Sequence, residues 1–457
     1  MNENQVLPGG AINEFAAFVA LDWGDREHSW SLQAAGSHSR ERGKLKQTPE
    51  AIEEWAANLA ARFGERPIAV ALEQSRGALV CALSRYRHLI LYPIPPAASA
   101  GIRAFAAPSG SKSDGRDADM QLDMLLWHRE KFRQLRPDDE QTRKLQALVE
   151  LRRQLVDQKT AATNQLTAHL KVCFPQALEW FEEAGSPLMV DFLRRWPTLG
   201  QLQAEKPKKV LAFLHGHNCR SEVRNQKRLQ EMASTRPLTT DGAVLEPLVL
   251  MIRTLLDLVE SLRKGISDME RALEGLFAAH PDYAIFASFP GAGPALAPRL
   301  LAAFGSDRSR FASAAEVQTF SGIAPVVSQS GQSKWIHFRW ACPKFLRQSF
   351  HEFAGISIQF CDWARTFYDK QRSRGKGHHA AVRSLAFKWI RILFACWRDR
   401  TPYHEPRHTD NLTARSISQS KPEPQSSASP SVDKNAKTVE LQFKSVAGFS
   451  KISAPAS

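Results

Sequence analysis

The pattern of apolar and polar positions divides the first part of the chain into alternating strands and helices. An apolar run that ends at Asp22 is followed by a tight turn and, after Asp25, by alternating polarity, which is typical of two consecutive strands. A helical pattern then begins after Thr48 and stops at Gly64. The chain therefore opens with elements of an α/β fold, and its first strand ends on an acidic residue.

Two more apolar runs continue this alternation. The stretch "PIAVALEQ" predicts a buried strand that ends at Glu73, and "HLILYPIPP" predicts a third strand closed by prolines. The intervening "SRGALVCALSRY" has a helical pattern. Strands that alternate with helices predict an α/β domain with a largely parallel or mixed sheet, which we expect to occupy residues 1–135.

Four carboxylates lie where these elements begin or end. Asp22 and Glu73 close two strands, and Asp114 and Asp117 open a helix after the third strand. Strand ends and the helix starts beside them converge on one edge of an α/β sheet, where ligand sites form. Side chains three apart on a helix lie about 5–6 Å from each other. Two like charges that close repel by about 1 kcal/mol in water and about 4 kcal/mol at an intermediate dielectric.

A divalent cation would offset this repulsion. Mg²⁺ binds one or two carboxylates and keeps positions open for phosphate oxygens, and two such ions can clamp the attacking and leaving oxygens of a phosphoryl transfer. A second interpretation of the helical pair stays open, because the helix dipole alone favours acids in a first turn. Asp119 and Asp123 lie close by and weaken the pattern. The strand-end acids favour the metal site, since a lone acid at the end of a buried strand is uncommon.

The middle of the chain, residues 136–279, is predicted to be helical. One apolar stripe runs from Gln141 to Phe174, and a second helix repeats apolar residues in steps of three and four over several heptads. This repeat predicts either dimerisation as a coiled coil or an antiparallel hairpin within one chain. Its members are Leu245, Leu248, Ile252, Leu255, Val259, Leu262, Ile266, Met269, Leu273 and Leu276.

A basic segment separates the two long helices. The stretch "EKPKKVLAFLHGHNCRSEVRNQKRLQEM" predicts short helices that either contact phosphate or form a solvated insertion. Within it, His215, His217 and Cys219 are candidate zinc ligands, but their two-residue spacing is a weak metal-site pattern. The six cysteines of the chain are scattered singly, which indicates reduced thiols and no disulfide framework.

Glycines and basic residues mark the third region, residues 280–407. In "FASFPGAGPALAPRLLAAFG", Gly291 and Gly293 form a turn that either presents backbone N–H groups to a DNA phosphate or simply joins two helices. Farther on, "RSRGKGHHAAVRSLAFKWIRILFACWRD" predicts a basic loop before an amphipathic helix whose Trp389 and Trp397 pack inward.

A serine-rich loop lies between these two motifs. Ser328, Ser330 and Ser333 surround Gly331 in "VSQSGQSKW", and cations follow. The loop either holds a phosphate or is a polar turn before a basic helix, and its composition alone does not single out a nucleophile, because a serine needs a base or a metal for activation. The residues that we expect to contact nucleic acid in this region are Gly291, Gly293, Lys334, Arg339, Lys344, Arg347, Lys376 and Arg383.

Composition adds the class of partner. The chain has 457 residues, enough for two or three domains. Its 61 Lys and Arg residues exceed its 47 Asp and Glu residues, which gives a formal charge of +14 and a pI near 9.6 and favours nucleic acid as the partner. Neither a spanning apolar run of roughly 18 residues nor a signal peptide is recognisable, so we expect a cytoplasmic protein without a membrane partner. Residues 408–457, rich in serine, proline and lysine, are predicted to be disordered.

Together these motifs resemble those of the DEDD insertion-sequence transposases, whose members are recombinases guided by a bridge RNA. The resemblance rests on "ALD", "ALEQSRG", "KSDGRDA", "FPGAGPALAPRLLAAFG" and "FSGIAPVVSQSGQS". It extends from "VALDWG" to "RDRTPY", nearly the whole chain before the tail. It implies an RNase H-like (RuvC-like) N-terminal domain, a long helical coiled-coil linker and a mainly α-helical C-terminal transposase domain.

The resemblance also implies roles for single residues. Ser330, directly before Gly331, takes the position of the nucleophile that attacks a DNA phosphate. The metal-binding tetrad is Asp22, Glu73, Asp114 and Asp117. The family places one subunit's carboxylates opposite another subunit's serine in a tetramer built of dimers. A non-coding bridge RNA pairs with donor and target DNA, so the protein itself reads little sequence. We therefore expect a Mg²⁺-dependent bacterial transposase associated with the nucleoid.

Other functions stay open at this point. A RuvC-like nuclease or Holliday junction resolvase would use metal-activated water and no covalent serine, and a non-catalytic DNA- or RNA-binding protein would carry a decayed site, although all four acids are present. Two features depart from the family pattern. The segment between Phe174 and Met232 is longer than a minimal linker, and Ser328 and Ser333 are alternatives to Ser330.

Overall fold

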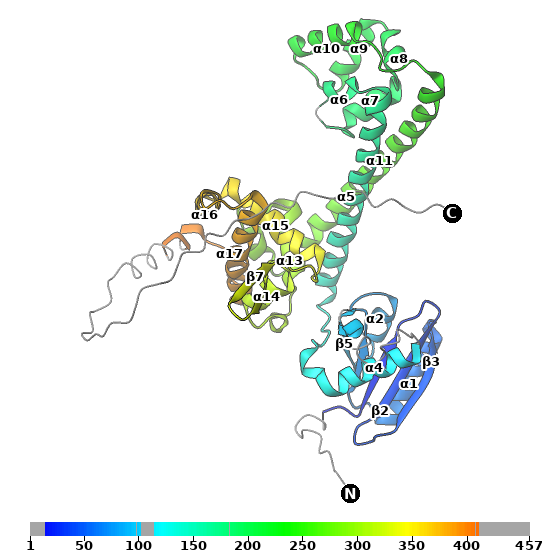
Figure 1. Ribbon diagram of the computed structural model, residues 1–457, viewed down its shortest axis with the longest axis vertical. Coiled ribbons are helices and arrows are strands. Elements are labelled where there is room, and N and C mark those ends of the chain that lie inside the picture. Colours follow the sequence, from blue (N-terminus) through cyan, green and yellow to red (C-terminus); the bar gives the residue numbers. More distant parts are fainter. Residues whose placement is uncertain (1–13, 97, 102–113, 182, 407, 411–457) are drawn as a thin grey trace, which may run out of the picture. The chain divides into compact units, whose positions relative to one another are not determined.

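The computed structural model describes residues 14–96, 98–101, 114–181, 183–406 and 408–410 (Figure 1). The chain divides into two compact units, Met1–Tyr403 and His404–Ser457. Of the tail that we predicted to be disordered, residues 408–410 are helical, and 411–457 lie outside the described residues. Within the described part of the chain, no helix combines the length and the apolar character that a membrane crossing requires.

The N-terminal part is built on a five-stranded mixed sheet. β1 pairs with β2 in antiparallel and with β4 in parallel, and β4 pairs with β5 in parallel. The prediction of an α/β domain with a mixed sheet is thus confirmed. In spatial order the strands are β3 (Arg40–Lys46), β2 (Glu27–Ala34), β1 (Ala17–Asp22), β4 (Ile68–Leu72) and β5 (Leu89–Pro93).

The sequence did not predict β3. This strand lies at the edge of the sheet and pairs with β2 alone. Leu45 is its one buried residue, so the alternation that marks a half-buried strand is missing from "RERGKLK". Gly43 allows the strand to pass beneath Trp30, because a Cβ at this position would overlap the Trp30 ring.

Helices cover both faces of the sheet. On one face lie α1 (Pro49–Phe63) and α2 (Ala78–Leu83), whose buried side chains share a core with Val19, Leu21 and Leu72. On the other face lies α4 (Asp114–His128), which packs on the alternate residues of the same strands. Because successive strand residues point to opposite faces, the residue after Leu21 and the residue after Leu72 are directed to the α4 side.

The two long helices α5 (Glu140–Cys173) and α11 (Gly242–Ala278) form an antiparallel hairpin (Figure 1). The C-terminal half of α5 shares a core with the N-terminal half of α11, and Arg152 near the start of α5 pairs with Glu270 near the end of α11. The heptad repeat therefore packs within one chain, which is one of the two predicted arrangements. Dimerisation stays a prediction.

The segment between these helices is a helical insertion. Its apolar side chains form one core with both long helices, centred on Phe174, Phe192 and Leu214. The prediction of short helices is confirmed. They are α6 (Gln176–Trp180), α7 (Pro187–Arg195), α8 (Leu199–Gln203), α9 (Pro207–Gly216) and α10 (Glu222–Ser234).

The C-terminal part of the first unit is mainly helical, as predicted. Its core gathers around Trp389 and Trp397, both fully buried as expected from the sequence. A two-stranded hairpin of β6 and β7 projects from these helices. The elements are α12 (Tyr283–Ala287), α13 (Gly293–Phe304), α14 (Ala314–Phe320), β6 (Val326–Ser330), β7 (Ser333–His337), α15 (Lys344–Phe360), α16 (Asp362–Ser373) and α17 (His378–Arg398).

Candidate active site

Strand register places Asp22 and Glu73 next to each other. Leu21 on β1 is the Cα partner of Leu72 on β4, so the two acids follow in register at the carboxyl ends of adjacent parallel strands, which lie about 4.8 Å apart. Both are half-buried. The strand alternation directs them to the face that α4 covers, and this is the sheet edge on which ligand sites form in α/β folds.

Helix α4 brings Asp117 and Gln121 to the same place. These residues are four apart and therefore share a helix face, and they are only 2% and 1% exposed. Gln121 Nε2 donates a hydrogen bond to Asp22 Oδ1 over 3.1 Å. Gln121 Oε1 is buried and has no hydrogen-bond partner in the described part of the chain. Sequence reasoning missed Gln121, although its spacing from Asp117 was a signal that could have found it.

Asp114 is the first described residue of α4, and its side chain lies outside what the structure describes. Among the side chains that are described, no group of three or more His, Cys, Asp and Glu lies close enough to hold a metal ion. The carboxylate tetrad therefore stays a prediction. The donors that are brought together, carboxylate oxygens beside an unpartnered amide oxygen, are of the chemical type that Mg²⁺ binds.

His215, His217 and Cys219, the candidate zinc ligands of the insertion, form no such group either among the described side chains. His217 Nε2 lies 2.9 Å from Asp191 Oδ2, and its ring lies 4.4 Å from the ring of Phe213. Cys219 Sγ points to the carbonyl oxygen of His217 at 3.9 Å. All six cysteines of the chain are free.

Asp119 and Asp123 have a different role from Asp117. Asp119 accepts hydrogen bonds from Ser31 Oγ at 2.7 Å and from Arg42 Nε at 2.9 Å. Asp123 pairs with Arg40, and this hydrogen bond is the main cause of the raised pKa of Arg40. These two acids hold α4 against β2 and β3 through hydrogen bonds and ion pairs. Their role is therefore structural and differs from the role expected for the acids at the strand ends.

The serine motif is a β-hairpin, so the expectation of a loop or polar turn is corrected. Ser330 at the end of β6 is the Cα partner of Ser333 at the start of β7, and Gly331 occupies the turn with a φ of 56°. Alternating polar residues had hidden the strands, because Ser328, Ser330 and Ser333 are all exposed and bury no apolar face. The hairpin presents Ser330 beside its tip.

Two guanidinium groups flank one aromatic ring at the foot of this hairpin. The Cζ atoms of Arg347 and Arg383 lie 4.6 and 4.7 Å from the centroid of Phe338. Burial lowers the pKa of Arg383, and the charge of Arg347 lowers it further. Neither arginine forms an ion pair with an acid of the described residues. Arg347 also donates a hydrogen bond to the carbonyl oxygen of Arg339 at 3.1 Å.

The other residues expected to contact nucleic acid lie on several elements. Lys334 on β7 and Lys344 at the start of α15 are exposed, and Lys376 Nζ donates to Ser384 Oγ at 3.1 Å. Gly293 opens α13 and is exposed. Gly291 has a packing role, since a Cβ there would lie 2.8 Å from the ring of Phe360.

Comparison with known proteins connects both parts of this arrangement to one family. Residues 19–175, which contain the sheet and α4, match the DEDD transposase model of IS110 elements. Residues 283–369, which contain the serine hairpin, match the model described as transposase of the IS116/IS110/IS902 family. The chain belongs to the IS110 family of transposases.

Two relatives of this transposase align with most of its length, and a third aligns with about two thirds of it. It is 27% identical over 407 residues to the mini-circle transposase named for IS117 of Streptomyces coelicolor, covering 86% of this chain and 97% of that protein. It is 28% identical over 408 residues to a protein of insertion element IS110 of the same organism, covering 85% and 96%. A protein of insertion element IS900 of Mycobacterium paratuberculosis is 29% identical over 295 residues, covering 64% and 73%.

Family membership establishes the general function. The protein is an insertion-sequence transposase that acts on DNA, and its DEDD family indicates use of a divalent metal.

Proposed function

We propose that this transposase cuts and rejoins DNA through Ser330, with Asp22, Glu73, Asp114 and Asp117 holding Mg²⁺ at the scissile phosphate. The observation that carries the proposal is the register of β1 and β4, which sets Asp22 beside Glu73 and opposite the buried face of α4. The strand order β3-β2-β1-β4-β5 with helices on both faces supports an RNase H-like domain in residues 1–135.

Mg²⁺, when bound, would stabilise the negative charge that develops on the phosphate oxygens. The residues of this chain have their own tasks. Asp22 is held by Gln121 in one orientation toward the site, so a ligand finds its carboxylate already placed. Asp117 lies in a buried position on α4, where a bound cation would favour the ionised form of its carboxylate.

Ser330 would carry out the transfer. Its Oγ forms a bond to phosphorus while one P–O bond of the DNA strand breaks, and the proton of the serine hydroxyl passes to the leaving oxygen. The serine phosphodiester conserves the energy of the broken DNA linkage, so a second DNA hydroxyl can reverse the step and rejoin strands without a nucleotide cofactor. The exposure of Ser330 beside the hairpin tip supports this role, because a DNA backbone can reach it.

The arginines at the foot of the hairpin would hold the DNA backbone. Arg347 and Arg383 lie beside each other on Phe338 without a carboxylate partner among the described side chains. A phosphate between or beside them would relieve their mutual repulsion. We place Gly293, Lys334, Arg339, Lys344 and Lys376 in the same contact area as weaker contributors.

We further propose that the protein acts as a dimer of dimers guided by a non-coding bridge RNA. Leu250 and Leu258 of α11 are not covered by α5 and remain 66% and 46% exposed, which leaves apolar surface for a second copy. The charge of +14 supports a nucleic acid that pairs with donor and target DNA. A monomeric mass by light scattering at micromolar concentration would contradict self-association.

The strongest rival is a metal-dependent nuclease or junction resolvase that uses water. The experiment that separates the two gives the protein its element's native flanking DNA, its transcript and Mg²⁺, and compares wild type with Ser330→Ala and Asp117→Asn. The proposal predicts that both variants lose cleavage and joining. Cleavage that survives Ser330→Ala would support the rival. DNA or RNA binding that needs neither Asp117 nor Mg²⁺, with no cleavage by wild type, would support a non-catalytic binding protein.

A further inference from the structure

The helical insertion contains a cavity of about 420 Å³. Three arginines line it on the α10 side: Arg220 just before the helix, and Arg224 and Arg228 on one face of its first two turns. Phe181 also lines it, and the guanidinium carbon of Arg228 lies 5.6 Å from its ring centroid. The volume is within the range of about 300–1,000 Å³ that is usual for small-ligand sites. We call this the arginine pocket.

The three arginines of the pocket have no ion-pair partner in the described part of the chain, whereas Lys209, Lys227 and His217 nearby each have an acidic partner. Among the described residues, Glu183 is the one acid that lines the pocket. Three cations that converge on a cavity repel each other, and an anion inside it would remove that repulsion.

Helix α10 adds partial positive charge at the same place. The helix begins at Glu222, and Ser221 before it makes no side-chain hydrogen bond to the first turn. The N–H groups of this turn therefore have no side-chain cap, and Ser221 lines the pocket. A helix of this kind favours a phosphate group at its N-terminus.

One buried amide indicates that the ligand carries hydrogen-bond donors as well as negative charge. Asn225 lines the pocket and is only 1% exposed. Its Nδ2 donates to the carbonyl oxygen of Cys219 at 2.6 Å, while its Oδ1 has no partner among the described residues. A bare anion would satisfy the arginines, but it has no donor for the unpartnered Asn225 Oδ1. The pocket instead suits a molecule with both a phosphate and a hydroxyl or amino group.

From these observations we propose that the arginine pocket binds a nucleotide unit of a nucleic acid strand, with the phosphate on the arginines and the sugar or base edge at Asn225. The strand is a guide RNA or a single strand of the element's DNA, which share this chemistry. The pocket lies on elements other than those of the carboxylates and Ser330, so it would anchor nucleic acid without taking part in strand transfer.

Cys219 gives a direct probe, because this half-buried thiol lines the same cavity. Full-length protein is alkylated with N-ethylmaleimide in the presence of a single-stranded RNA, a single-stranded DNA of the same sequence, or inorganic phosphate. Peptide mass spectrometry follows Cys219 and, as internal reference, the exposed Cys81. Oligonucleotide titrations give an apparent affinity from the protection of Cys219.

The informative variant is Arg220→Gln with Arg224→Gln, since both side chains are exposed and their loss leaves the core intact. The matched control is Lys206→Gln with Lys208→Gln, which removes the same charge from exposed, unpaired residues that do not line the pocket. We expect RNA, DNA or both to protect Cys219 in wild type and control. In the arginine variant, the negative slope of log affinity against log salt should become shallower by about 1.4, which is about 0.7 for each lost phosphate contact on a single strand.

Each other result would overturn the inference. Equal protection in the arginine variant, with an unchanged salt slope, would mean that Arg220 and Arg224 do not hold the strand. Protection by phosphate as strong as by the oligonucleotides would reduce the pocket to an anion site. No protection by any strand would exclude nucleic acid from it. These readouts do not depend on cleavage, so a failure here and a failure of the Ser330 mechanism are distinguishable, and the Ser330→Ala variant should show wild-type protection.

Discussion

Gln121 Nε2 donates a hydrogen bond to Asp22 Oδ1 over 3.1 Å and thereby joins the buried face of α4 to the end of β1. Gln121 and Asp117 are both almost fully buried on that face. The amide fixes the carboxylate without neutralising its charge, which is what a metal ligand needs. The strand end and the helix thus form one site, although the two residues are far apart in the sequence.

Replacing Gln121 by leucine should weaken metal binding. The variant lacks the hydrogen bond from Gln121 that orients Asp22, and loss of such an outer contact typically lowers metal affinity by about 10–100-fold. Mn²⁺ titration followed by electron paramagnetic resonance measures this affinity without any cleavage assay. Gln141→Leu is the control, because the hydrogen bond that Gln141 makes among the described residues goes to the backbone of Leu276. Equal Mn²⁺ affinity in wild type and Gln121→Leu would show that the amide does not position a metal ligand.

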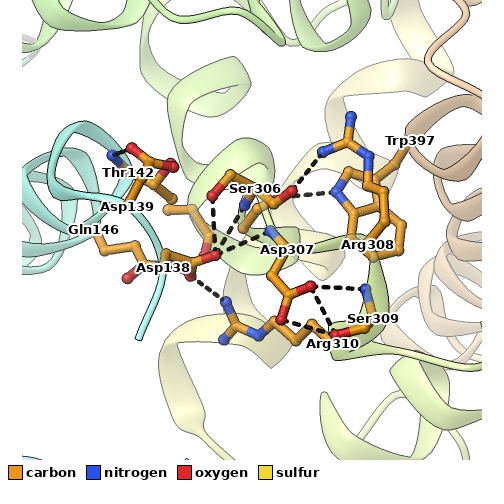
Figure 2. A network of polar contacts seen from close by, with 12 residues as sticks. Asp138, Asp139, Thr142, Gln146, Ser306, Asp307, Arg308, Ser309, Arg310 and Trp397 are labelled. Atoms are coloured by element: carbon orange, nitrogen blue, oxygen red, sulfur yellow. Dashed lines mark hydrogen bonds and ion pairs between the residues drawn. The ribbon is translucent and has the colours of Figure 1, made fainter. Parts of the chain in front are cut away.

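Asp138 connects the start of the linker to the C-terminal helices (Figure 2). Its buried carboxylate accepts hydrogen bonds from Gln146 Nε2, Ser306 N and Asp307 N, and pairs with Arg310 at 3.0 Å. Burial lowers the pKa of Arg310, against the opposing charge of Asp138. The carboxylate therefore compensates a desolvated cation and several backbone donors at once.

The variant Asp138→Ala should lose about 3 kcal/mol of unfolding free energy, because it leaves a half-buried cation and two backbone N–H groups without their partner. Urea unfolding followed by tryptophan fluorescence measures this, since Trp389 and Trp397 lie in the same core. Asp157→Ala serves as control: its carboxylate is 60% exposed in a helical pair with Arg153, and its loss should change stability by less than about 0.5 kcal/mol. Similar losses in both variants would contradict the role of Asp138.

His280 should make the stability depend on pH. Asp282 N donates to His280 Nδ1 at 3.0 Å, so the ring is neutral there, and its Nε2 contacts Thr142 Oγ1 at 2.9 Å. Burial lowers the pKa of His280, despite the opposing charges of Asp282, Asp139 and Asp138. A base whose folded pKa is lowered contributes full stability above its ordinary pKa of 6.5 and loses it as the pH falls below that value.

Chemical denaturation between pH 8 and about pH 5 would therefore show a free energy of unfolding that decreases toward acid, with a smaller slope in His280→Gln. The contribution of His351, whose pKa is also lowered chiefly by burial, is retained in that variant. An unchanged slope would contradict the assignment. At lower pH, Asp139 should act in the same direction. Its pKa is lowered to about 2, because hydrogen bonds, among them those from Thr142, outweigh the effect of burial.

Arg383 should contribute one backbone contact to DNA. In Arg383→Gln, the negative slope of log affinity against log salt for duplex DNA should become shallower by about 0.9. The loss of affinity should be similar for all DNA sequences. Fluorescence anisotropy over a salt series measures it. The control Arg62→Gln removes an exposed arginine that is already paired with Glu41 and should keep the wild-type slope. A sequence-dependent loss would instead indicate that Arg383 reads bases.

Much of the fold could be predicted because its signals are local. Asp22 and Glu73 follow strongly apolar runs, and Thr48 and Gly64 bound α1 as expected: Thr48 Oγ1 accepts from Ala51 N, and Gly64 adopts a left-handed φ of 63°. The parts that escaped prediction lack an apolar pattern. The strand β3 buries one leucine, and the serine hairpin has no alternation of buried apolar and exposed polar residues.

The composition of the site depends on tertiary contacts that local patterns do not contain. The acids from Asp114 to Asp123 look alike in the sequence. The ion pairs with Arg40 and Arg42 on the unpredicted β3 distinguish Asp119 and Asp123 from the buried Asp117. Gln121 carries no charge and fits the helical pattern, so its bond to Asp22 became visible only when β1 and α4 were seen together.

The most direct test of the central claim is a search for DNA attached to Ser330. Protein incubated with its native flanking DNA, its transcript and Mg²⁺ is denatured, digested and analysed by mass spectrometry for a serine peptide that carries a nucleotide. The account predicts this adduct on Ser330 in wild type, and its absence in Ser330→Ala and Asp117→Asn. DNA cleavage by wild type without any protein adduct, or an adduct on Ser328 or Ser333 that persists in Ser330→Ala, would contradict it.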